Sequence, residues 1–141
     1  MRLFLAAAGL ATMTACAPTP ASKPAAAAPT GDAALGGGEW AVFEINNQPI
    51  VANSKPTITF EDGRVSGAGS CNRFMGGYTV SADGLTLEMS QMASTMMACP
   101  DALMQQEGVF LGALGSAKSY SVSGPTLTLT TSDGTTVKAT R

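Results

Sequence analysis

The 141-residue chain contains no histidine. Histidine is the commonest general base in enzymes and a frequent ligand of metal ions, so its absence argues against both kinds of site. Charged residues make up only 13% of the chain, and the eight Lys and Arg form no basic cluster. Nucleic acids are bound through many contacts between basic side chains and phosphates. The composition therefore favours a protein that is not an enzyme, needs no cofactor or metal and binds no nucleic acid.

Long apolar runs are also scarce, and the first one is too short to cross a bilayer, which takes about 20 residues. Residues 1–15 are typical of a secretory signal, with a positive charge followed by an apolar run at 3–11. Met13-Thr14-Ala15-Cys16 then resembles a bacterial lipobox, in which the cysteine is acylated and becomes the new N-terminus. The sequence predicts lipid attachment at Cys16; an ordinary signal cleaved after Ala17 is the alternative.

The predicted anchor gives the chain its expected location. Several acyl chains hold a protein stably at a membrane surface, because each buried methylene contributes about 0.8 kcal/mol. The residue after Cys16 is Ala17, whereas lipoproteins kept in the inner membrane of enteric bacteria carry Asp there. We therefore expect an exported protein in the cell envelope, held by its lipids at the outer membrane and facing the periplasm.

Residues 16–38 lack aromatic side chains and any apolar period. They contain four prolines among small residues and end in three consecutive glycines. Such a segment buries too little apolar surface to offset the entropy lost on ordering, and proline extends it. We predict a disordered linker that spaces the domain from the membrane; a tail that is processed or merely tolerated is the alternative.

Residues 39–141 form one domain, whose apolar residues mostly alternate along the chain. The predicted strands are Trp40–Ile45, Thr57–Phe60, Arg64–Ser66, Tyr78–Val80, Leu85–Met89, Tyr120–Val122, Leu127–Thr130 and Thr136–Ala139. Three Asp-Gly pairs predict hairpin turns between antiparallel neighbours. The sequence thus predicts a mainly β (α+β) fold: an antiparallel meander forming a cracked or partial β-barrel, with one helix packed against it.

The predicted helix is Asp101–Gly115. Leu103, Phe110 and Leu114 recur at helical spacing on one face. Three glycines weaken this helix by up to about 1 kcal/mol each relative to alanine. Either tertiary packing holds the helix, or the glycines allow it to approach the sheet closely.

Cysteine is rare: once Cys16 is acylated, only Cys71 and Cys99 remain. Two thiols in an oxidising compartment favour a disulfide bond. The loop that it closes would contribute about 3.5 kcal/mol in the chain-entropy model. Two buried free thiols, or a redox pair, are the alternatives.

The residues around Cys71 form the motif Gly-Ala-Gly-Ser-Cys-Asn-Arg, starting at Gly67. Its glycines indicate bulges or close backbone approach. A phosphate loop is not indicated, because Gly-x-Gly alone is a weak sign of one. Asn72 suits a left-handed turn. Arg73 would contact a ligand, bond loop carbonyls or pair with an acid such as Glu44. We therefore take Asn72 and Arg73 as structural or binding positions.

Methionine is unusually frequent between the two cysteines. Thioethers and thiolates are soft ligands that select Cu(I), but methionine also fills irregular gaps in protein cores. A disulfide would remove the thiolate, which favours core filling. The residues concerned are Met75, Met89, Met92, Met96 and Met97, with Cys99.

Taken together, these motifs resemble the META-domain family of envelope proteins, which includes heat-shock-inducible lipoproteins. The matching segments are Trp40, Thr57–Phe60, Asp62–Gly67, Ser70–Phe74, Gly77–Thr79, Met92–Cys99, Glu107, Phe110–Leu111, Leu127–Leu129 and Asp133-Gly134. The resemblance implies a partial barrel with a helix. It also implies roles in envelope stress, novobiocin resistance, motility or virulence, and it supplies no catalytic residues.

The function expected from these features is non-enzymatic. We predict a lipid-anchored envelope domain that contributes to stress tolerance or drug resistance by binding an envelope protein or an apolar ligand. Asn72, Arg73, Met96 and Met97 are its candidate motif positions. A lipid-carrier or pilot-like lipoprotein with an apolar cavity is one alternative, and a methionine-rich Cu(I)-binding protein is the other.

Overall fold

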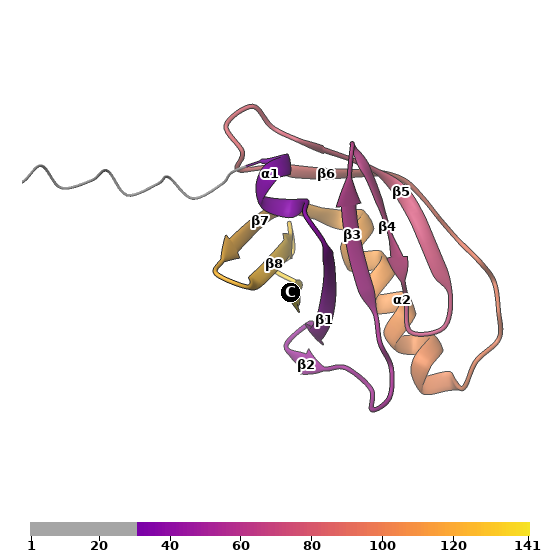
Figure 1. The fold of residues 1–141 in the computed structure, drawn as a ribbon. Helices are drawn as coiled ribbons and strands as arrows, with labels where there is room; N and C mark the ends of the chain where they lie inside the picture. Colours follow the sequence, from indigo (N-terminus) through magenta and orange to yellow (C-terminus); the bar gives the residue numbers. More distant parts are fainter. Residues whose placement is uncertain (1–30) are drawn as a thin grey trace, which may run out of the picture.

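The computed structural model describes residues 31–141. This part of the chain forms two helices and nine strands (Figure 1). In chain order they are α1 (Asp32–Leu35), β1 (Glu39–Ile45), β2 (Gln48–Pro49), β3 (Thr57–Glu61), β4 (Arg64–Ala68), β5 (Arg73–Val80), β6 (Leu87–Ser94), α2 (Asp101–Ser116), β7 (Ala117–Ser123), β8 (Thr126–Thr131) and β9 (Thr136–Thr140). Neither helix is long and apolar enough to cross a membrane.

All strands belong to one antiparallel sheet with the order β6-β5-β4-β3-β1-β9-β8-β7, and the short β2 pairs with β1. Strands β3 to β6 follow one another as a meander, and so do β7 to β9. The last strand returns beside the first, where Val42 lies opposite Ala139. The predicted meander is confirmed, and α2 connects its two blocks as the sequence indicated.

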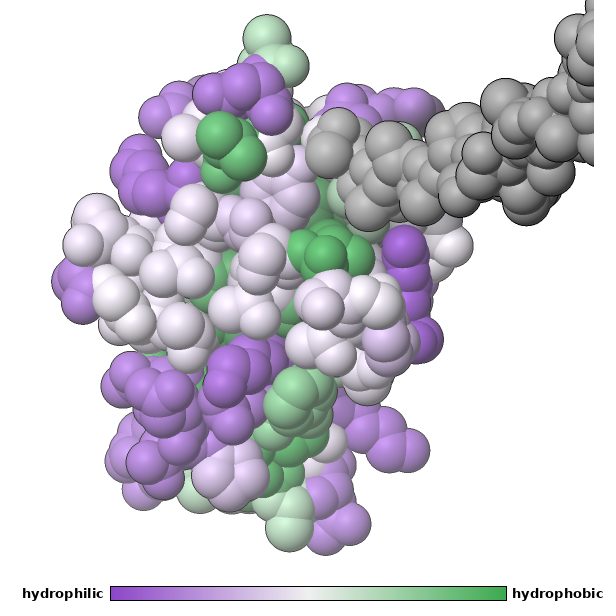
Figure 2. All heavy atoms as spheres, turned by 90° about the vertical axis from the view of Figure 1, so that its left-hand side faces the viewer, coloured by the Kyte–Doolittle hydropathy of each residue, from purple (hydrophilic) through white to green (hydrophobic). Residues whose placement is uncertain are grey.

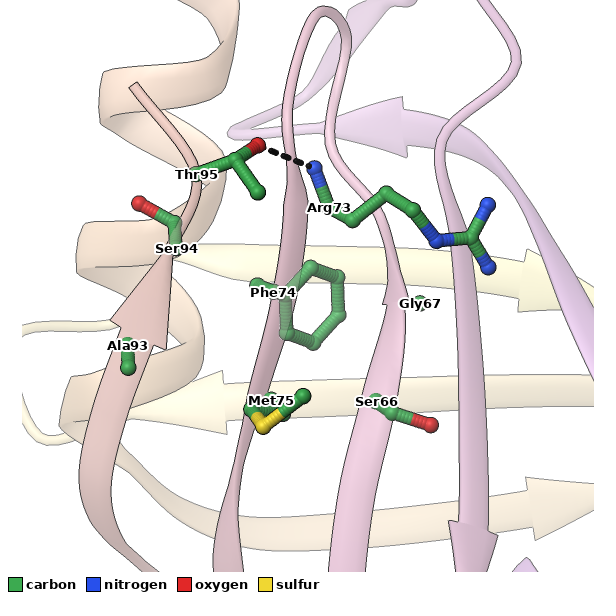
Figure 3. A pocket seen from close by; sticks show the side chains of 8 residues that line it. All are labelled: Ser66, Gly67, Arg73, Phe74, Met75, Ala93, Ser94 and Thr95. Atoms are coloured by element: carbon green, nitrogen blue, oxygen red, sulfur yellow. Dashed lines mark hydrogen bonds between the residues drawn. The ribbon is translucent and has the colours of Figure 1, made fainter.

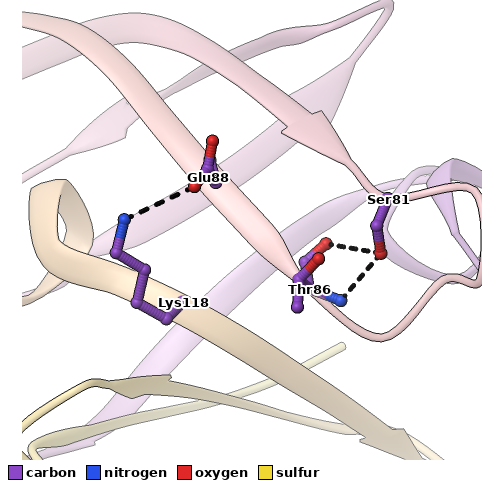
Figure 4. A network of polar contacts seen from close by, with 4 residues as sticks. All are labelled: Ser81, Thr86, Glu88 and Lys118. Atoms are coloured by element: carbon purple, nitrogen blue, oxygen red, sulfur yellow. Dashed lines mark hydrogen bonds and ion pairs between the residues drawn. The ribbon is translucent and has the colours of Figure 1, made fainter.

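The two ends of the curled sheet, β6 and β7, approach each other but pair at a single bridge within residues 31–141. An isolated bridge joins Thr86, just before β6, to Ser119 of β7. Next to it, the Lys118 ammonium lies 3.6 Å from the Glu88 carboxylate, and Ser81 accepts a hydrogen bond from the Thr86 N–H (Figure 4). Beyond this point β6 and β7 do not form a continuous ladder. The cracked-barrel prediction is therefore confirmed.

Helix α2 packs its apolar face against the inside of the curled sheet. Phe110, Ala113 and Leu114 are buried, and the Phe110 ring meets Phe74 of β5 edge to face, with ring centres 5.7 Å apart. Further fully buried side chains fill the interior: Trp40, Ile58, Phe60, Val65, Leu87, Leu127, Leu129 and Val137. Fully burying a side chain of this size stabilises the fold by about 1.5–3 kcal/mol. The space between helix and sheet is thus a packed hydrophobic core.

The helix glycines do not bring α2 close to the sheet. At Gly108, Gly112 and Gly115, a Cβ would meet nothing within 4 Å. These three positions face solvent, so the packing of the opposite face must hold the helix. Of the two explanations that the sequence left open, tertiary packing is the one that the structure supports.

The folded unit begins before Glu39, where the sequence placed the boundary. Leu35 of α1 is fully buried, and its carbonyl accepts a 2.7 Å hydrogen bond from the Trp40 indole. The Arg141 guanidinium lies 4.2 Å from the centre of the Trp40 ring and donates to the Gly36 carbonyl. The predicted disordered linker 16–38 is therefore wrong for its last residues. The predicted signal at 1–15, Cys16 and the remainder of the linker lie outside the described residues.

The face that bears β7 and β8 is mostly polar or neutral (Figure 2). Its apolar side chains appear as separate green areas between pale and purple ones. Serine and threonine provide most of the outward positions of these strands, as in Ser121, Ser123 and Thr126. The candidate site lies on the other block of the sheet, β4 to β6.

Candidate functional site

The two cysteines of the domain form a disulfide bond, as predicted. Cys71 lies in the turn between β4 and β5, and Cys99 lies just before α2. Their Cα atoms are 6.0 Å apart, and 28 positions separate them in sequence. The bond ties the middle of the meander to the entrance of the helix.

A second, polar connection runs beside the disulfide. The Glu107 carboxylate of α2 points into the β4–β5 turn and is only 5% exposed. It accepts hydrogen bonds from the N–H groups of Cys71 (2.7 Å) and Asn72 (2.6 Å) and from the Asn72 side-chain amide (2.6 Å). A Cβ on Gly69 would collide with this carboxylate. Consecutive N–H groups of a turn make an anion-binding concavity. The glycine motif does bind an anion, but that anion is the protein's own Glu107.

These hydrogen bonds determine the charge state of Glu107. Burial by itself would raise the pKa of the carboxyl group. The N–H groups of Asn72 and Cys71 favour the charged form and outweigh burial, so the pKa of Glu107 lies below its ordinary value of 4.5. Glu107 is therefore an anion at neutral pH, stabilised from within.

Asn72 also holds the segment between β6 and α2. Its side-chain oxygen accepts hydrogen bonds from the Thr95 hydroxyl (2.9 Å) and from the Met97 N–H (2.6 Å). Asn72 is not among the residues with positive φ. The predicted left-handed turn is thus wrong: asparagine is needed here because its side chain both donates and accepts.

Gln106 makes the third connection, next to Glu107 on the helix. Its side-chain oxygen accepts from the Val51 N–H (2.5 Å), and its amide donates to the hydroxyls of Ser54 (3.0 Å) and Ser70 (2.5 Å). We call Cys71, Asn72, Cys99, Gln106 and Glu107 the clasp. The polar side chains of the clasp all form hydrogen bonds with other groups of the domain. The clasp is therefore a structural device and not a binding site.

Residue pattern alone did not assign Gln106 and Glu107 any role in a site. The signal was present, because Glu107 falls at the same helical spacing as Leu103, Phe110 and Leu114. An acidic residue within the apolar stripe of a helix predicts a buried carboxylate that accepts hydrogen bonds from nearby donors.

Arg73 lies next to the clasp and has a different environment. Its backbone N–H donates to the Thr95 hydroxyl at 3.1 Å, but its side chain points away from that contact (Figure 3). The guanidinium forms no hydrogen bond or ion pair with any residue in 31–141. Glu44 pairs instead with Lys138, at 2.6 Å. The predicted pairing of Arg73 with Glu44 is therefore wrong, and a ligand contact remains open to Arg73.

A hollow of about 500 Å³ lies beside Arg73 on the outer face of the sheet (Figure 3). We call it the β5 hollow; residues of β4, β5, β6 and the position after β6 line it. The register places Ser66 and Ala93 on either side of Met75. Because both neighbours are small, Met75 stands out with 59% of its surface exposed. Phe74, which points mainly into the core, adds an apolar part of the lining.

Met96 and Met97 are exposed, by 96% and 61%. The predicted role as core fillers is therefore wrong for these two residues and for Met75, which is 59% exposed. Met89 and Met92 do pack against the core as partly buried residues. The sulfur of Cys99 belongs to the disulfide and is no thiolate. Among residues 31–141, no three or more Cys, Asp or Glu side chains gather as a metal-binding group.

Two further carboxylates, Asp83 and Asp133, lie in hairpin turns. Asp83 accepts a hydrogen bond from the Leu85 N–H (3.0 Å), and Asp133 accepts one from the Thr135 N–H (3.1 Å). Hydrogen bonds from nearby hydroxyls, followed by these N–H groups, lower the pKa of both carboxyl groups. Both aspartates act as turn residues of the Asx type.

Comparison with known proteins gives a family match and a fold match. The model of the META domain family matches residues 33–141. The NMR structure of a protein from Burkholderia xenovorans is similar, with a TM-score of 0.63 and 23% identity over 89% of this chain and 98% of that one. A crystal structure of a DUF4847 family protein from Bacteroides vulgatus has a TM-score of 0.60 and 16% identity over 75% and 93%. At these identities the likeness concerns the fold alone. A search of curated protein sequences found no match.

Proposed function

We propose that this chain, which belongs to the META domain family, is a lipid-anchored domain of the cell envelope that acts by binding another molecule. The β5 hollow is the observation that carries this proposal. It combines an exposed thioether with a guanidinium that forms no ion pair among residues 31–141, both on the outside of a rigid sheet. Binding sites typically join an apolar lining to a few polar groups that orient the ligand.

The physical chemistry of the β5 hollow favours binding. Apolar surface removed from water contributes about 25 cal/mol per Å², and Met75 is available for such burial. The strands that carry the lining are fixed by the ladders on both sides of β5. Little conformational entropy would therefore be lost on binding, which is the usual advantage of a preformed site. A role in envelope stress tolerance or drug resistance is the process that we propose for this binding.

Two alternatives have less support. A lipid carrier needs a continuous apolar cavity beside the helix, but large buried side chains, among them Trp40, Phe60 and Phe110, fill that space. A Cu(I) site would have to use thioethers alone, because the disulfide takes up Cys99.

Affinity purification from the native envelope tests the binding proposal. Ala93→Phe fills the β5 hollow from its edge, and Ser123→Phe places the same ring on exposed β7 as a matched control. We expect quantitative mass spectrometry to find a molecule that copurifies with the wild type and with Ser123→Phe but not with Ala93→Phe. Equal recovery with all three proteins would refute the β5 hollow as the binding site.

The anchor needs its own test, because it depends on Cys16. Intact-mass analysis of the membrane fraction should find a mature chain that begins at Cys16 and carries acyl groups. Cys16→Ser should release the domain from the membrane. A mature chain that starts after Ala17 and has no acyl mass would contradict the anchor and leave the binding proposal standing.

A further inference from the structure

We infer that the β5 hollow receives an extended segment of a partner protein, in which a large apolar residue lies two positions from an acidic one. In this arrangement the apolar side chain lies against Met75, and the carboxylate binds the Arg73 guanidinium. The inference rests on the proposed function and adds the chemistry of the ligand.

The charges on the outer face indicate an anionic group at one end of the β5 hollow. Two arginines lie on this face on either side of Met75, Arg73 towards the clasp and Arg64 towards the β3–β4 turn. Arg64 is the register partner of Glu61, so an opposite charge lies directly across from it. Arg73 has as its register partner the uncharged Ala68. Neither arginine forms an ion pair among residues 31–141, but only Arg64 has a carboxylate as its register partner. Arg73 is therefore the freer of the two to bind a carboxylate, which a guanidinium does through two parallel hydrogen bonds.

The spacing within β5 fits an extended peptide. Arg73 and Met75 are two residues apart and point to the same side of the strand, about 7 Å apart along it. Alternate side chains of an extended partner segment have the same spacing. A carboxylate and an apolar side chain two positions apart would therefore reach Arg73 and the β5 hollow together.

The remaining lining favours a peptide over a lipid. Two serines of the lining, Ser66 and Ser94, carry hydroxyls that form no hydrogen bond within residues 31–141, whereas the Thr95 hydroxyl is already bonded to Asn72 and to the Arg73 N–H. A peptide backbone offers N–H and carbonyl groups to such hydroxyls, whereas an acyl chain has no hydrogen-bonding group along its length. Desolvating these hydroxyls without a partner would cost affinity.

A random heptapeptide library displayed on phage is the probe, selected on the purified full chain. We expect enriched peptides in which Asp or Glu lies two positions from a large apolar residue. Selection on Arg73→Gln should lose the acidic preference and keep the apolar one. Arg64→Gln, the matched control on the same face, should keep both, and Ala93→Phe should lose both. Urea unfolding of each variant confirms that it is folded.

Binding constants then separate the two proposals. For a synthetic peptide taken from the selection, Arg73→Gln should weaken binding about tenfold, the usual loss for one charge-assisted hydrogen-bonded pair. An Asn or Gln version of the peptide should bind both proteins with similar affinity. If apolar peptides are enriched with no acidic preference, the inference fails and the proposed site stands. If no peptide is enriched, but dodecanoate gives saturable NMR shifts around Met75, the ligand is a lipid and the peptide inference is overturned. If neither probe binds there, both proposals fail.

Discussion

The buried carboxylate of Glu107 gives the sharpest prediction about the fold. In Glu107→Gln the side chain keeps its shape but loses its charge and one acceptor. At present one oxygen accepts two backbone N–H groups and the other accepts the Asn72 amide. The glutamine oxygen can take the place of the oxygen that accepts the two N–H groups. The glutamine NH2 group would then face the Asn72 NH2 group, so that two donors meet and no hydrogen bond forms. Asn72 cannot flip to relieve this, because its oxygen is bonded to Thr95 and Met97.

The expected loss follows from these contacts. Hydrogen bonds to charged groups contribute about 1 kcal/mol more than neutral ones, and two such bonds become neutral. A buried donor without a partner costs a further 1–3 kcal/mol. We expect Glu107→Gln to lower the free energy of unfolding by about 3–5 kcal/mol at pH 7. Equilibrium unfolding in urea, followed by circular dichroism, measures it.

The pH dependence of this loss has a definite sign. The folded pKa of Glu107 lies below its ordinary value of 4.5, so its stabilisation is complete above that pH and is lost as the pH falls through the folded pKa. The difference between wild type and Glu107→Gln should therefore shrink towards pH 3. Glu88→Gln removes an exposed carboxylate whose ion pair with Lys118 is long, and should change the stability by under about 0.5 kcal/mol. A loss below 0.5 kcal/mol for Glu107→Gln at pH 7, or one that does not change with pH, would refute our reading of the clasp.

Three further stability predictions follow from the same contacts. Replacing Cys71 and Cys99 together by serine should cost about 3.5 kcal/mol, and an unchanged urea midpoint would contradict the disulfide's role. Gly69→Ala should destabilise the domain by at least about 1 kcal/mol, because its Cβ would collide with the Glu107 carboxylate. Gly112→Ala has open space around its Cβ and should stabilise the helix by up to about 1 kcal/mol. The opposite order of stabilities would be inconsistent with this packing. Leu35→Ala should cost about 2–5 kcal/mol in thermal or urea unfolding, and a negligible change would mean that α1 does not belong to the folded unit.

The alternation of apolar residues predicted eight of the nine strands and the meander, and the helical spacing of apolar residues predicted α2. It missed the short β2 and the first half of β5, and it placed β6 too early. Asp-Gly turns such as Asp62-Gly63 predicted the hairpins, because their positive φ values are local properties. The disulfide could be predicted because the folded domain contains two cysteines. The residue pattern did not predict contacts between distant parts of the chain: the Arg141 guanidinium lies over the Trp40 ring and bonds the Gly36 carbonyl, and Lys138 pairs with Glu44. Such contacts depend on how the chain returns on itself, which local periodicity does not encode.

The candidate site shows the same division. Sequence reasoning identified the neighbourhood of Cys71 but could not separate the roles of adjacent residues. Asn72, in the turn before β5, is directed inward and holds the clasp, whereas Arg73, the first residue of β5, is directed outward to the β5 hollow, on the same side as Met75. The β5 hollow itself arises from small residues on neighbouring strands, Ser66 and Ala93, which only the register brings beside Met75.

The claim that this domain binds a partner through the β5 hollow is tested most directly by photo-crosslinking in intact cells. A benzophenone amino acid at position 93 faces the β5 hollow, and one at position 123 lies on the exposed end of β7. We predict a discrete crosslinked protein from position 93 and none from position 123. The absence of any product from position 93, or the same products from both positions, would contradict the account.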